Sequence, residues 1–166
     1  LTDRGLTFGV AAGLTALFAL CVLTGRLLTG FLVDRVAPLA VAAVLTALPA
    51  AGCALLAWGD VTLAVAVAAV ILLGLQQGAE VDLLAFFVAR FFGMRTYASI
   101  FGSLIMVMAF STAAGVASWG AVHDATGRYD LALVGSIAAF LLGALCFLAL
   151  GRPPARVPAA VPQPVG

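Results

Sequence analysis

The chain has 166 residues, of which 64% are hydrophobic and only 9% are charged, and its mean hydropathy is +1.22. Soluble domains carry about a quarter charged residues, so this composition excludes an ordinary soluble domain and indicates an integral membrane protein with the lipid bilayer as a partner. The formal net charge is +1, and the few charges are scattered rather than gathered in a basic stripe. The sequence therefore predicts no nucleic-acid partner.

Five apolar segments are long enough to cross the hydrocarbon core of a bilayer, which takes about 20 helical residues. They are too long and too uniformly apolar for barrel strands, and in lipid their backbone hydrogen bonds must close within each segment. The sequence predicts an all-α integral membrane fold, with residues 1–150 in one bundle. Its five transmembrane helices are expected at residues 8–33, 36–58, 61–89, 97–119 and 131–150.

The two ends of the chain lead to separate predictions. Residues 151–166 hold five of the seven prolines. Because proline has no backbone N–H to donate, we expect an extended, disordered tail there. The chain begins with leucine and shows no secretory signal peptide, so we expect it to be a piece of a longer protein.

The arginines divide unequally between the two sides of the predicted bundle. Alternating the five crossings places six arginines on one side and two, with several aspartates, on the other. Because cytoplasmic loops carry an excess of basic residues, the arginine-rich side is predicted to be cytoplasmic, with the N-terminus outside and the C-terminus inside. The six are Arg26, Arg35, Arg90, Arg95, Arg152 and Arg156, and the two are Arg4 and Arg128.

The third apolar segment is the most polar of the five, because it carries Gln76, Gln77, Glu80 and Asp82. Such residues usually face a bundle interior or water, so this helix is predicted to line a pathway. At about 100° per residue, Glu80 and Asp82 point roughly 200° apart, whereas Gln76 and Glu80 share a face. We expect Gln76, Gln77 and Glu80 to face a central cavity. The alternatives are helix packing for the glutamines and ion pairing at the helix end for Glu80.

Charged residues near the predicted cytoplasmic ends form a second set of candidates. Counting about 20 residues from the start of each segment places Arg26 and Glu80 near the cytoplasmic boundary. We expect Asp82 to pair with Arg26, Arg35 or Arg90 on that side. The alternative for Arg26 and Arg90 is a structural role, in which the long side chain reaches the interface and fixes the topology.

The remaining reactive residue types form no catalytic or metal-binding pattern. The single histidine, His123, falls in the predicted loop HDATGRYD and is interpreted as a solvated residue, because no second ligand is near in sequence. The three cysteines fall one to a segment, as small hydrophobic residues do. No phosphate-binding loop, HExxH zinc motif or GxSxG nucleophile motif is present. The sequence predicts no metal, no cofactor and no enzyme activity.

The stretch GFLVDR at residues 30–35 resembles the loop motif G-x-L-x-D-R-x-G-R-[RK] of the major facilitator superfamily of transporters. Ala37 and Pro38 stand where the family has glycine and arginine, which is similar to the weaker, C-terminal copy of the motif. The stretches LTDRGLT, GAEVDLLAFFVARFFGMRTYASIFG and HDATGRYD are similar, in this order, to the C-terminal half of bacterial members near the monocarboxylate and oxalate–formate branch. The resemblance covers residues 1–150.

This resemblance implies that the five segments correspond to family helices eight to twelve, with helix ten at the central cavity and helices nine and twelve outside. It implies alternating access in the bacterial inner membrane, with the missing N-terminal half and a small-molecule substrate as partners. It also implies a cytoplasmic gate. To this gate we assign Gly30, Asp34 and Arg35 of the loop motif, together with Arg26, Asp82 and Arg90.

The substrate class stays open at this point. Anion carriers of the similar branch use charged residues deep in helices eight and eleven, but this chain has none between Phe8 and Gly25 or between Tyr97 and Trp119. The leading hypothesis is a fragment of a secondary active transporter that moves a small solute, coupled to a proton or a counter-substrate. The alternative is a five-helix membrane protein that acts in interaction or assembly without transport.

Overall fold

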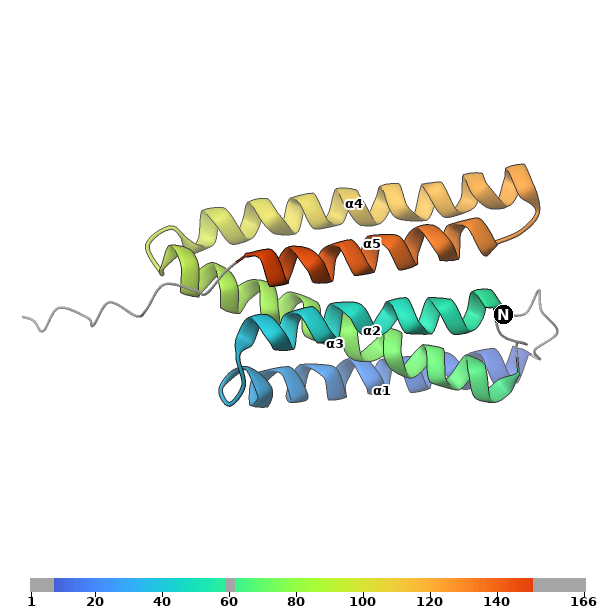
Figure 1. Ribbon diagram of the computed structural model, residues 1–166, viewed down its shortest axis with the longest axis horizontal. Coiled ribbons are helices and arrows are strands. Elements are labelled where there is room, and N and C mark those ends of the chain that lie inside the picture. Colours follow the sequence, from blue (N-terminus) through green and yellow to red (C-terminus); the bar gives the residue numbers. More distant parts are fainter. Residues whose placement is uncertain (1–7, 59–61, 151–166) are drawn as a thin grey trace, which may run out of the picture.

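The computed structural model describes residues 8–58 and 62–150, and every regular element within these ranges is an α-helix (Figure 1). All five helices are long and apolar enough to cross a membrane, which is the architecture of a multi-pass membrane protein. The predictions for the tail after residue 150, and for Arg4, Arg152 and Arg156, lie outside the described residues. The helices are α1 (Phe8–Val33), α2 (Pro38–Trp58), α3 (Leu63–Phe92), α4 (Tyr97–Thr126) and α5 (Asp130–Ala149).

The helices run along one long axis, and successive helices run in opposite directions (Figure 1). α3 crosses the bundle obliquely and packs most extensively on α1, while α2 packs on both α3 and α5. α4 lies at the edge, beside α5. The turn after α1 and the connection after α3 lie at the same end of the bundle, so Arg35 and Arg95 share that end. We call it the arginine-rich end.

Two helices extend beyond the apolar segments that predict them. α3 and α4 have 30 residues each, about 45 Å at 1.5 Å per residue, which exceeds a hydrocarbon core of about 30 Å. The apolar segment of α4 ends near Trp119, but the helix continues to Thr126, because a helix need not stop where its side chains become polar. The prediction that His123 is a loop residue is wrong: it lies in the last turn of α4 and is half-buried.

The contact between α1 and α3 depends on glycine. Gly74 and Gly78 form a G-x-x-x-G pair on α3, and Cys21, Gly25 and Thr29 recur at the same spacing on α1. All five residues, which we call the α1–α3 seam, are buried. A Cβ atom at Gly78 would collide with the α1 backbone, and one at Gly74 would lie 2.6 Å from the Cβ of Cys21. The glycines thus allow the backbones to meet, and van der Waals packing of this kind drives helix association in lipid.

Thr29 supplies the polar side chain of the seam and is 2% exposed. Its hydroxyl donates to the carbonyl oxygen of Gly25 at 2.8 Å, so it is satisfied within its own helix. The seam therefore needs no polar partner from another helix.

α2 lies between α3 and α5 and contacts both through small residues. A Cβ atom at Gly52 would lie 3.3 Å from the Ala69 carbonyl oxygen of α3, and one at Gly143 of α5 would lie 3.3 Å from Cγ2 of Thr46. Toward the arginine-rich end the packing changes to larger side chains. An apolar cluster there joins Ala42 of α2 with Ala79, Leu83 and Phe87 of α3.

α4 is the most peripheral helix. None of its 30 residues is buried. The hydroxyls of Ser103, Thr112 and Ser118 donate to carbonyl oxygens of α4 itself, at 2.8, 2.9 and 2.8 Å. These three hydroxyls are therefore satisfied within α4, whereas the buried Nδ1 of His123 has no hydrogen-bond partner among the described residues.

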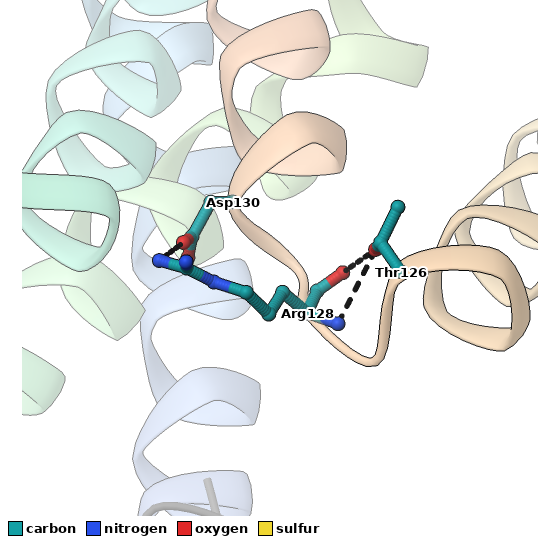
Figure 2. A network of polar contacts seen from close by, with 3 residues as sticks. All are labelled: Thr126, Arg128 and Asp130. Atoms are coloured by element: carbon teal, nitrogen blue, oxygen red, sulfur yellow. Dashed lines mark hydrogen bonds and ion pairs between the residues drawn. The ribbon is translucent and has the colours of Figure 1, made fainter.

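The turn from α4 to α5 has a defined geometry (Figure 2). Gly127 ends α4 in the left-handed region, with φ of 65°, and its N–H donates to the His123 carbonyl oxygen at 2.7 Å. The Thr126 hydroxyl accepts from the Arg128 N–H at 3.3 Å, and the Arg128 guanidinium pairs with the Asp130 carboxylate. These contacts connect residues close in sequence, so they shape the α4–α5 hairpin at the end opposite the arginine-rich one.

The seam predicts opposite outcomes for one substitution at two glycines. Gly78→Ala forces the α1 and α3 backbones apart and is expected to lower the free energy of unfolding by about 1–3 kcal/mol, the usual cost of overpacking. Gly115→Ala on α4 meets nothing within 4 Å of its Cβ. That variant should be neutral or more stable, because alanine favours a helix over glycine by roughly 1 kcal/mol.

Reversible unfolding of both variants in mixed detergent micelles measures the difference. Equal stability of the two variants would show that the seam does not hold α1 against α3.

Candidate functional site

A cavity of about 570 Å³ lies between α2, α3, α4 and α5. We call it the inter-helix cavity. Its wall is mostly apolar, with the rings of Phe87, Phe91, Phe92 and Phe147 among its lining residues. The volume falls in the range of roughly 300–1,000 Å³ that is typical of small-molecule sites.

Three polar side chains line this cavity: Thr46 of α2 and Gln76 and Glu80 of α3. Gln76 and Glu80 are one helical turn apart and half-buried, and both line this cavity. Gln77 does not line the cavity and is exposed on the outer surface of the described bundle.

The orientation of α3 follows from the α1–α3 seam. Gly74 and Gly78 face α1, and a residue two positions further along a helix points about 200° away. Gln76 and Glu80 therefore face away from α1, toward α2, α4 and α5. Asp82 continues the Gly74–Gly78 stripe at the next turn, so the carboxylates of Glu80 and Asp82 belong to different faces of α3.

The three polar side chains of the cavity have no partner among residues 8–58 and 62–150. Within the described residues, neither Thr46, Gln76 nor Glu80 makes a side-chain hydrogen bond or ion pair. Thr15, Thr24 and Thr29 on α1, by contrast, all donate to the carbonyl four residues earlier. The polar groups that line the cavity are thus left free for water or a ligand.

Pro49 removes one backbone hydrogen bond from α2, near the cavity. It is fully buried within the helix and has no N–H to donate to the carbonyl of Leu45, one turn earlier. Leu45 and Thr46 both line the cavity. A proline inside a membrane helix is tolerated where neighbouring helices or water satisfy the freed carbonyl.

Arg26 and Glu80 lie at a similar level along the bundle, because the Arg26 backbone packs beside Gly78. Both residues lie inside their helices rather than at the ends, since α1 continues to Val33 and α3 to Phe92. The residue count predicts the cytoplasmic boundary of the membrane near both residues, so in that interpretation α1 and α3 continue beyond the boundary.

The loop-motif residues lie at the arginine-rich end, between α1 and α2. Gly30 is exposed within α1, and Asp34 and Arg35 are exposed in the turn. The Arg35 guanidinium lies over the ring of Phe31, with 4.1 Å from Cζ to the centroid, which is a cation–π contact. The Leu32 carbonyl accepts from the N–H groups of Arg35 and Val36 at 3.1 and 2.8 Å, which closes the turn.

Asp82 and its expected arginine partners are not joined in the described part of the chain. No ion pair there connects Asp82 to Arg26, Arg35 or Arg90. Arg90 instead lies over Phe86, 6.0 Å from the ring centroid, and its Nε is buried without a hydrogen-bond acceptor among the described residues. Asp34, Arg35 and Arg90 thus lie toward one end of the bundle, whereas Arg26 and Asp82 lie further along their helices from that end. No ion pair joins these residues in the described part of the chain.

The described residues hold no group of three histidine, cysteine or acidic side chains that could bind a metal ion. Comparison of the chain with protein-family models, with curated proteins and with solved structures gives no match. Two features of the site have a recognisable sequence pattern that an inspection of charged residues does not detect. They are the G-x-x-x-G spacing of Gly74 and Gly78, and Pro49 within an apolar run.

The aromatic wall of the cavity predicts a difference between two phenylalanines. Phe87 is 7% exposed, and its ring centroid lies 5.5, 6.1 and 5.7 Å from those of Phe86, Phe91 and Phe147. Phe87→Ala is expected to lower the free energy of unfolding by about 3 kcal/mol, the lower end for buried phenylalanine, because membrane packing lacks the full transfer term.

Phe110 of α4 is the matched control, since it is 70% exposed. Phe110→Ala should change stability by less than about 0.5 kcal/mol, as a surface substitution does. Denaturation of both variants in detergent micelles compares them, and an equal loss would contradict the packing described for the wall.

Proposed function

We propose that this chain is the C-terminal portion of a secondary active transporter, which moves a small solute across a bacterial inner membrane by alternating access. The observation that carries the proposal is the inter-helix cavity, which Gln76 and Glu80 line without a side-chain partner among the described residues. Polar and ionisable residues inside a membrane bundle are costly, and they commonly mark substrate or ion pathways. The loop-motif resemblance at residues 30–35 supports the same assignment.

The roles in this proposal divide between two regions. Gln76 and Glu80 contribute to the solute or proton pathway. The loop-motif residues Gly30, Asp34 and Arg35, with Arg26, Asp82 and Arg90, form one side of a cytoplasmic gate, whose partners come from the other half of the transporter. Free charges at one end of the bundle fit a gate that closes against a second half.

The gate assignment predicts the effect of Asp34→Asn in the full-length protein. Uptake of the solute found by profiling organic acids, sugars and organic cations should fall about tenfold, because losing about 1.4 kcal/mol from one conformational state shifts the equilibrium by that factor.

Asp124→Asn, an exposed carboxylate at the other end of the bundle, is the matched control and should leave uptake unchanged. Both variants need the wild-type amount in the membrane. Normal uptake by Asp34→Asn would remove Asp34 from the gate.

The orientation of the chain is part of the proposal and has its own test. In a background with Cys21, Cys53 and Cys146 replaced by alanine, a cysteine at Arg95 should react with a membrane-impermeant maleimide only after the cells are opened. A cysteine at Arg128 should react in intact cells. Four described arginines, Arg26, Arg35, Arg90 and Arg95, support this orientation through the positive-inside rule. The reverse labelling pattern would invert the topology and place the loop motif outside.

The second candidate is a membrane interaction or assembly protein that does not transport. The uncovered surface of α4 favours it, because a helix without buried residues can receive another chain. A stable, defined homo-oligomer of residues 1–166 expressed alone would support this candidate. Rapid degradation of the same chain, or six to seven further apolar segments encoded upstream in frame, would support the transporter.

A further inference from the structure

The inter-helix cavity carries one sign of charge. Of the described residues that line it, Glu80 is the sole ionisable side chain, and no arginine is among them. Asp82 and Arg90 are on the same helix but do not line the cavity. A carboxylate in an apolar wall attracts a cation and repels an anion far more strongly than it would in water.

The other polar groups of the cavity can accept hydrogen bonds. The Thr46 hydroxyl and the Gln76 amide each have an acceptor oxygen, and an ionised Glu80 carboxylate only accepts. The groups on this wall therefore suit a positively charged or hydrogen-bond-donating ligand.

The rest of the wall is apolar and aromatic. Phe87, Phe91, Phe92 and Phe147 line the cavity together with Met108. Phenylalanine faces attract cations through the ring quadrupole, and methionine adapts to ligands of irregular shape. A strongly hydrated inorganic cation gains little from such a wall, whereas an organic cation with apolar substituents contacts both the rings and the carboxylate.

Resting on the proposed function, we infer that the substrate of the inter-helix cavity is a small lipophilic organic cation, with Glu80 as its counter-charge. The phenylalanine rings of the wall would contact the apolar part of the ligand, and the Glu80 carboxylate would attract its positive charge. This substrate class differs from the carboxylates of the transporter branch that the sequence resembles.

Two probes of the same shape and opposite charge test the inference. Tetraphenylphosphonium and tetraphenylborate are each titrated into the purified full-length protein in detergent, with equilibrium dialysis as the readout. The phosphonium is expected to bind and the borate is not. Glu80→Gln should weaken phosphonium binding by about tenfold or more, because it removes the charge partner of a desolvated cation.

Two variants serve as controls. Asp124→Asn removes an exposed carboxylate of α4 that does not line the cavity, and it should leave phosphonium affinity unchanged. Glu80→Asp keeps the charge and should retain most of the affinity, with all variants eluting as a single species. Equal binding of both probes, or unchanged binding by Glu80→Gln, overturns the inference. Absence of phosphonium binding also overturns it, and is the result expected if a further helix of the protein fills the cavity.

The outcome separates this inference from the transport proposal. Charge-selective phosphonium binding without uptake of phosphonium into vesicles would keep the site and overturn transport of this ligand. Uptake of a solute of another class, unaffected by Glu80→Gln, would keep transport and overturn the substrate assignment.

Discussion

The close approach of α1 and α3 is the constraint on which the rest of the arrangement depends. Gly74 and Gly78 have no side chain to hold the α1 backbone away, and Gly25 meets the carbonyl of Leu75 from the other side. The contact fixes the rotation of α3 about its own axis. Because both glycines must face α1, the residues on the opposite face of α3 are fixed as well.

The position of the polar residues follows from that rotation. Gln76 and Glu80 are placed opposite the seam, where α2, α4 and α5 leave a cavity instead of a close contact. Most other hydroxyls of the bundle bond their own helix, as Thr29 and Thr112 do, and so cost little in lipid. The side chains of Thr46, Gln76 and Glu80 make no such hydrogen bond within the part of the chain that the structure describes. Their free energy cost must be offset by water or by a ligand in the cavity.

The charged loop residues form a region separate from the cavity. Arg35 covers Phe31 and closes the turn after α1, while Arg90 covers Phe86 on α3. Neither contact uses the carboxylates of Asp34 or Asp82. In the described part of the chain, Asp34 and Asp82 make no ion pair with Arg26, Arg35 or Arg90.

The sequence by itself determined that the chain forms membrane helices, because each apolar segment must satisfy its backbone hydrogen bonds alone. It also placed Gln76 with Glu80 and apart from Asp82, since helical periodicity is local. Only the tertiary structure decided which face of α3 meets α1, and that Gln77 lies outside the cavity. The pattern of apolar residues likewise could not predict the length of α4 or the place of His123 within it, because a helix can extend past its hydrophobic segment. Packing between helices depends on shape at the seam, and the glycines that create this shape carry no hydrophobic or charge signal.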